Sequence, residues 1–142
     1  LASNAVTRRL SAAYEAGTSL AAGPRVLVGM PPGGRHELGL FAFAVAARRH
    51  GLVTDYLGAD LPLADWLAAA AAPEVTAIVI AMHTEADVAA TKEVLTALQA
   101  QRPDLIIAVG GAQQDLAPEG IIRLGHRIGA AAETLAGLAR SR

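Results

Sequence analysis

The most reactive arrangement in the sequence lies in one short stretch, residues 30–39, which reads MPPGGRHELG. An apolar, β-branched run ends as this stretch begins and a helix-like run follows it, so His36 stands at a strand-to-helix corner. An imidazole at such a corner can face a ligand crevice, where it can bind a metal or act as an acid or base. Gly39 lets another group approach the helix closely because it has no side chain. The stretch therefore predicts a binding site with His36 as its reactive group.

Two later points in the chain can contribute to the same site. Gly110 and Gly111 follow the fourth predicted strand, and a strand end without side chains lets backbone N–H groups approach a bulky ligand. His83 and Thr84 follow the third predicted strand. Neither G-x-G-x-x-G nor G-x-x-x-x-G-K-[ST] occurs at the first loop, so the sequence does not favour a dinucleotide or triphosphate site.

The elements that position these loops alternate between short apolar runs and helical patterns. The predicted strands are residues 25–30, 53–57, 75–81 and 104–109, with a brief strand near 127–128. The predicted helices are residues 6–20, 37–50, 62–72, 85–101, about 118–124, and 130–140. Five βα units after one leading helix predict an α/β fold with a doubly wound, five-stranded parallel sheet, because five units cannot close an eight-stranded barrel. Such sheets bind ligands at the carboxyl ends of their strands.

The composition excludes several classes of protein. With no cysteine, the chain can form neither disulfides nor a thiolate zinc site, and this fits a reducing compartment, so we expect a cytoplasmic protein. The net charge of -1 gives no one-sided basic surface for nucleic acid. The longest apolar run, residues 38–47, is about half of the roughly 20 residues that a membrane-spanning helix needs. We therefore expect no direct contact with DNA or a membrane.

Three motifs together carry a family resemblance: PPGGRHELG, then LGADLP after the second predicted strand, then VGG at the end of the fourth. They resemble the cobalamin-binding domain, whose signature is D-x-H-x-x-G, S-x-L and G-G. The version found in light-sensing, MerR-type transcriptional regulators is the most similar. The resemblance covers nearly the whole chain and implies a Rossmann-like, flavodoxin-like fold that binds cobalamin, as adenosylcobalamin or another corrinoid.

The resemblance assigns roles to individual residues. His36 matches the histidine that replaces the dimethylbenzimidazole base as the lower axial ligand of cobalt, which is the base-off mode, and it is the one metal ligand we expect. Gly39 matches the last position of that motif, and Gly110 and Gly111 match the glycine pair beside the buried nucleotide tail. The residues expected to contact the cofactor are Gly33, Gly34, Arg35, His36, Gly39, His83, Thr84, Gly110 and Gly111.

The sequence departs from the family signature at two places. The acidic position two residues before the histidine is Gly34, so the carboxylate that orients the imidazole through its other nitrogen is absent. The serine of S-x-L falls on Ala81 and its leucine on His83, so a hydroxyl that would contact the tail is lost unless Thr84 replaces it. The departures leave open a domain that keeps the fold without binding cobalamin.

Four other residues have ordinary structural explanations. His50 lies where a helix C-terminus favours a cation, and His126 lies in a loop. Asp60 is predicted to be the N-cap of the helix at 62–72, and Trp66 to anchor that helix to the sheet.

Two classes of function fit these observations. The first is a sensory binding module, not an enzyme, that holds cobalamin base-off and relays ligand or light state to a DNA-binding domain. Residues 1–22 then form the remnant of a helical cap, residues 23–142 form the cobalamin-binding domain, and we expect DNA contact only through a missing N-terminal domain and a homo-oligomer in the full-length protein. The second is the corrinoid-carrying domain of a methyltransferase or mutase. A third possibility is a degenerate module that binds no cobalamin and serves only in oligomerisation.

Overall fold

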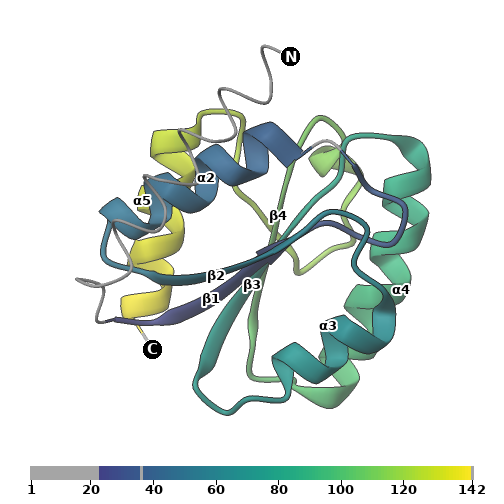
Figure 1. The fold of residues 1–142 in the computed structure, drawn as a ribbon, viewed down its shortest axis with the longest axis horizontal. Helices are drawn as coiled ribbons and strands as arrows, with labels where there is room; N and C mark the ends of the chain where they lie inside the picture. The colour runs from purple at the N-terminus through teal and green to yellow at the C-terminus, as the bar shows by residue number, and fades with distance from the viewer. Residues whose placement is uncertain (1–22, 36, 142) are drawn as a thin grey trace.

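The computed structural model describes residues 23–35 and 37–141, which form one five-stranded sheet with the strand order β2-β1-β3-β4-β5 (Figure 1). Every neighbouring pair of strands is parallel. The strands are β1 (Arg25–Gly29), β2 (Val53–Gly58), β3 (Val75–Ala81), β4 (Ile106–Gly110) and β5 (Ile122–Arg123). The strand order reverses between β1 and β3, which is the doubly wound, flavodoxin-like arrangement, and the predicted fold class is confirmed.

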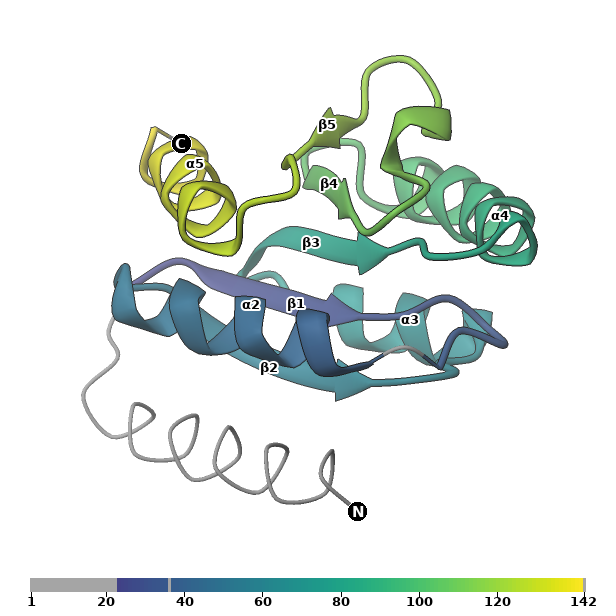
Figure 2. The same cartoon turned by 90° about the horizontal axis from the view of Figure 1, so that it is seen from above.

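Helices cover both faces of the sheet, as Figure 2 shows from above. The helices are α2 (Glu37–Arg49), α3 (Leu63–Ala70), α4 (Glu85–Gln101) and α5 (Ile128–Arg140), with a short 3-10 helix, η1 (Gln114–Leu116). Helices α2 and α5 pack together on one face, and α3 and α4 on the other. None of these helices in the described part of the chain is long and apolar enough to cross a bilayer.

The two faces of the sheet have separate aliphatic cores. Val26 and Val28 of β1 point into the core beneath α2 and α5, whereas Leu27 points into the core beneath α3 and α4. Trp66 is fully buried on the second face, and its indole N–H donates to the backbone carbonyl of Met30 at 3.2 Å. Trp66 therefore anchors α3 to the end of β1, as predicted.

The last third of the described chain differs from the prediction. The predicted helix at 118–124 is wrong, because η1 ends before this region, and the region holds a turn and then β5, which pairs Ile122 with Ala108 of β4. The predicted strand near 127–128 is also wrong, since α5 already begins at Ile128. Gly120 and Gly125 both have φ of +85°, a left-handed conformation that interrupts a helix on either side of the short strand. The predicted helix at 6–20 lies outside the described residues.

Candidate functional site

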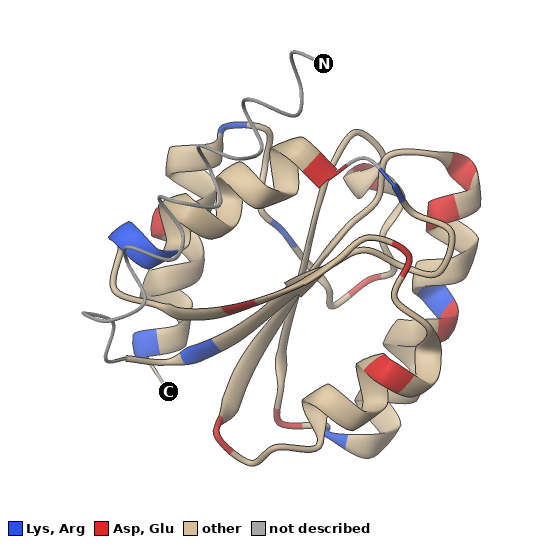
Figure 3. Cartoon of the chain, in the orientation of Figure 1, with Lys and Arg blue, Asp and Glu red and all other residues tan. Residues whose placement is uncertain are grey.

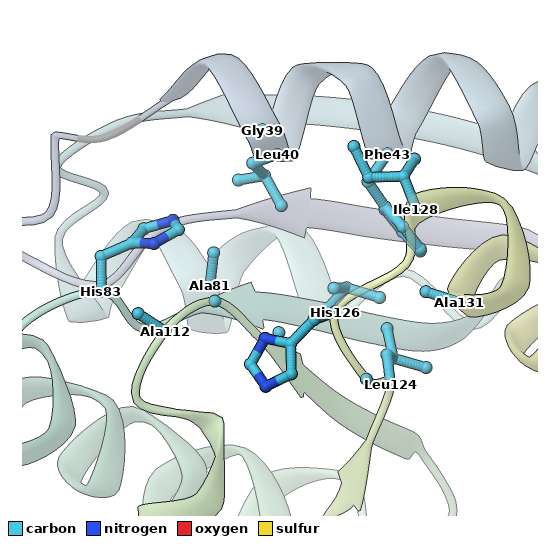
Figure 4. Close-up of a pocket in the computed structure, with 14 residues that line it drawn as sticks. Gly39, Leu40, Phe43, Ala81, His83, Ala112, Leu124, His126, Ile128 and Ala131 are labelled. Atoms are coloured by element: carbon cyan, nitrogen blue, oxygen red, sulfur yellow. The ribbon is translucent and has the colours of Figure 1, made fainter.

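A pocket of about 310 Å³ opens at the carboxyl ends of β3 and β4 (Figure 4). One wall is α2, through Gly39, Leu40 and Phe43; another is the segment before and within α5, from Leu124 to Ala131. The floor is made by β3 and β4 with the loops that follow them. Almost all of the lining is apolar, with the imidazoles of His83 and His126 as the exceptions among the described residues. Such a pocket suits a small organic group with mainly apolar surface.

Two of the predicted glycines keep this pocket open. A β-carbon at Gly39 or at Gly110 would meet no atom within 4 Å, because both positions face the space of the pocket. Gly39 lies four residues before Phe43 on α2, so the two positions share the helix face that lines the pocket. The absence of side chains here leaves room for a ligand.

Gly111 has a different role at the rim. Its φ is +91°, and a β-carbon there would lie 2.3 Å from the carbonyl oxygen of Met82. The same carbonyl accepts the N–H of Gln113 at 2.9 Å, while the N–H of Met82 donates to the carbonyl of Gly110. Glycine is therefore required at 111 to bring the loop after β4 against the loop after β3.

Gln114 holds the floor of the pocket together. It is buried, and its amide nitrogen donates to the carbonyls of Gly111 at 3.0 Å and Gly125 at 3.1 Å, while its amide oxygen accepts the N–H of Gly125 at 2.7 Å. The amide nitrogen also lies 3.3 Å from Nδ1 of His126. Sequence reasoning missed Gln114, because a glutamine in a polar loop resembles a surface residue.

Replacing Gln114 with leucine is expected to lower the free energy of unfolding by roughly 2–3 kcal/mol, because a buried N–H and two carbonyls lose their partner. Urea denaturation followed by circular dichroism measures the change. The neighbouring substitution Gln113→Leu is the matched control. An equal loss in both variants would show that the Gln114 network is not the cause.

His83 and Thr84 lie between β3 and α4, but they face different surroundings. The ring of His83 lies against the pocket beside Ala81, on the side of Leu40 (Figure 4). Thr84 is the N-cap of α4: its hydroxyl accepts the N–H of Asp87, and the Asp87 carboxylate accepts the N–H of Thr84, both at 3.1 Å. The structure therefore brings His83 together with the pocket glycines and uses Thr84 as a helix cap outside the described pocket lining.

The loop between β1 and α2 lies at the same edge of the sheet. Gly33, Gly34 and Arg35 contact Asp60, which follows β2. The prediction that Asp60 is the N-cap of α3 is wrong, because Pro62 occupies that position. His36 lies outside the described residues.

Glu37, the first residue of α2, is turned toward β2. Its carboxylate accepts a hydrogen bond from the Tyr56 hydroxyl at 2.7 Å. Burial, together with this hydrogen bond and the nearby Glu37 charge, raises the pKa of Tyr56, so the phenol remains the donor. One oxygen of the Glu37 carboxylate therefore accepts the Tyr56 hydroxyl.

Charge and metal-ligating groups are sparse around the pocket. Figure 3 shows the acidic and basic residues of the described chain spread over several helices and loops. Within residues 23–35 and 37–141, no group of three or more histidine, aspartate or glutamate side chains could hold a metal ion. Such a site would bind a ligand through shape complementarity and apolar contacts more than through charge.

Comparison with known proteins identifies a family to which the domain that contains this pocket is similar. The family model described as the B12 binding domain matches residues 24–139. The HTH-type transcriptional repressor CarA from Myxococcus xanthus is 41% identical over 64 residues, which are 45% of this chain and 22% of the repressor.

Two solved structures from Methanosarcina barkeri share the fold. The monomethylamine corrinoid protein aligns with a TM-score of 0.78 and 17% identity over 96% of this chain and 66% of that one. The methanol:cobalamin methyltransferase complex MtaBC aligns with a TM-score of 0.70 and 20% identity over 83% of this chain and 47% of that one. The chain thus spans less than two thirds of each of these relatives, the repressor included.

Proposed function

Since this chain belongs to the B12-binding domain family, and so is a cobalamin-binding domain, we propose that it holds the cofactor base-off, with His36 on cobalt and the nucleotide tail in the pocket. The observation that carries this proposal is the pocket itself. Gly39 and Gly110 leave its walls open, and its lining is almost wholly apolar. The residues present fit a flat, substituted benzimidazole, which needs apolar walls close to the backbone on both sides.

The place of His36 in the chain supports its proposed role. Gly33, Gly34 and Arg35 lie at the carboxyl edge of the sheet, and Gly39, three residues after His36, lines the pocket. A ligand whose tail fills the pocket can therefore present its metal centre to the loop after β1. Imidazole nitrogen is a suitable axial ligand for cobalt.

We favour a sensory binding module over an enzyme. Among the described pocket residues the ionisable side chains are two imidazoles, His83 and His126, with no carboxylate placed to form an acid–base pair with either. The similarity to a transcriptional repressor supports the same choice. When bound, an alkylcobalamin would supply a light-sensitive cobalt–carbon bond, and the role of this domain would be to hold the cofactor and relay its change.

The rest of the proposed regulator lies outside the described domain. We assign residues 23–142 to the cobalamin-binding domain and residues 1–22 to the end of a helical cap. DNA contact belongs to a separate N-terminal domain, the full-length protein is a homo-oligomer, and it works in the cytoplasm. The corrinoid carrier of a methyltransferase is the second candidate, because two corrinoid-protein structures share the fold.

Spectrophotometric titration with hydroxocobalamin tests the proposal. We expect saturable binding with a spectrum of the base-off, histidine-ligated form. Cobinamide, which lacks the nucleotide tail, is expected to bind at least tenfold more weakly, a loss of about 1.4 kcal/mol, because the pocket stays empty. Equal affinity for the two corrinoids would contradict the role of the pocket, and no binding of either would contradict the function.

A further inference from the structure

We propose that Asp60 is a positioning residue for cobalt ligation: from the loop after β2, it fixes the loop that leads into His36. This inference rests on the proposed function, in which His36 is the lower ligand. Asp60 would then act through the backbone of residues 33–35 without touching the cofactor.

Asp60 contacts three consecutive residues of the loop after β1. One carboxylate oxygen, Oδ1, accepts the N–H of Gly33 at 2.6 Å. The backbone N–H of Asp60 donates to the carbonyl of Gly34 at 2.7 Å. Its other carboxylate oxygen lies 3.5 Å from the Arg35 guanidinium. One residue, 27 positions away from Gly33, thus contacts the three residues immediately before His36.

The backbone of Asp60 is itself unusual. Its φ of +51° makes it the one non-glycine residue with a positive φ in the described part of the chain. Aspartate tolerates this left-handed conformation better than most residues, but it persists only where surrounding contacts fix it. The hydrogen bonds to Gly33 and Gly34 are such contacts.

The family signature places an orienting carboxylate two residues before the histidine, and this chain has a glycine there. A β-carbon at Gly34 would lie 3.1 Å from Cδ of Pro31 and 3.2 Å from Cβ of Met30, so a side chain there requires the loop to shift. Glu37 is engaged with the Tyr56 hydroxyl. Asp60 is the carboxylate that the structure does place on this loop.

The consequence for ligation follows from how tightly a metal ligand must be held. Ligand groups need supporting contacts that fix them within about half an ångström, and loss of a supporting partner typically weakens metal binding about 10- to 100-fold. If the Asp60 carboxylate fixes the loop, releasing Gly33 and Arg35 from it should weaken the bond between His36 and cobalt while leaving the tail pocket intact.

Three substitutions separate the contributions of Asp60. Asp60→Asn keeps an acceptor oxygen and tolerates positive φ, so we expect histidine ligation within about threefold of the parent. Asp60→Gly relieves the backbone strain but removes the acceptor, so we expect the equilibrium between ligated and free histidine to shift toward free by tenfold or more. Asp60→Ala loses the acceptor and keeps the strain, and should be the most affected.

Two measurements test the series. The first is the fraction of histidine-ligated cobalamin, read from the visible spectrum at saturating hydroxocobalamin. The second is amide hydrogen exchange at Gly33 in the cofactor-free protein, where protection should persist in Asp60→Asn and fall in Asp60→Gly. In the His36→Ala background, Asp60→Gly should change the spectrum no further, because both substitutions act on the same bond.

The outcomes distinguish this inference from the proposed function. If the parent protein binds no cobalamin, the proposed function fails. If the parent binds with histidine on cobalt and Asp60→Gly keeps the same ligated fraction, the positioning role of Asp60 is wrong. Unchanged exchange at Gly33 in Asp60→Gly would also overturn it, by showing that the contact does not hold the loop.

Discussion

Replacing Gly39 with leucine is expected to abolish cobalamin binding while making the domain more stable. The position lines the pocket, and a β-carbon there meets open space, so the larger side chain occupies the volume assigned to the nucleotide tail. The same change removes a glycine from α2, which should raise the free energy of unfolding by roughly 0.5–1 kcal/mol. We expect affinity to fall by more than about 100-fold, or about 2.7 kcal/mol.

Spectrophotometric titration and thermal unfolding measure these two opposed effects. Gly137→Leu on α5 is the matched control, because a β-carbon at Gly137 also meets no atom within 4 Å and this residue lies outside the pocket lining. The control should gain similar stability and keep the parent's affinity. Binding by Gly39→Leu as tight as that of the parent would mean that the tail lies elsewhere.

Substituting alanine for His36 is expected to remove the nitrogen ligand from the lower face of cobalt. The tail pocket is unchanged in this variant, so cobalamin should still bind, with at least tenfold lower affinity and with the spectrum of a base-off form that lacks histidine. Electron paramagnetic resonance of the cob(II)alamin form gives the direct measurement. One axial ¹⁴N splits each line into three, and ¹⁵N-histidine labelling of the parent should change three lines to two.

His50→Ala serves as the control for His36→Ala. His50 follows α2 at the opposite edge of the sheet, where its backbone carbonyl, which the substitution retains, accepts a hydrogen bond from Arg140. The spectrum of cobalamin bound to this variant should match that of the parent. Retention of the nitrogen splitting in His36→Ala would identify another residue as the ligand.

Strands β1, β3 and β4 were predictable because each is a mostly apolar run with proline or glycine on at least one side, and a buried parallel strand needs little else. Strand β2 also holds Thr54 and Asp55, and it was predictable from its β-branched and aromatic residues between Gly51 and Gly58. Strand β5 was not predictable, because a strand of two residues has no hydrophobic periodicity and its position in the sheet depends on pairing with β4. Gly120 and Gly125 mark the turns on either side of it, but a single glycine does not specify which element it interrupts.

The site residues that were predictable are those with a local sequence signal, whereas the residues that act through long-range hydrogen bonds were not predictable. Gly39, Gly110 and Gly111 were predicted as site residues from their places at strand and helix ends, and the structure brings them to one pocket. The hydrogen bonds of Gln114 and Asp60 join loops that lie 11 and 27 residues apart, and no spacing rule reports such contacts. Asp60 was assigned to the helix that follows it, because a cap is the commonest role for an aspartate before a helix.

The pocket lies on the seam between the two halves of the doubly wound sheet. Helix α2 belongs to the first half of the chain, while β3, β4 and α5 belong to the second, and the halves meet where β1 pairs with β3 and α2 packs on α5. A ligand bound in this pocket contacts both halves of the domain and links them non-covalently. The two halves cannot separate until the ligand dissociates, so the ligand-bound domain should unfold as one cooperative unit. Its free energy of unfolding should rise with ligand concentration, by about 2.7 kcal/mol when the free ligand is at a hundredfold excess over Kd.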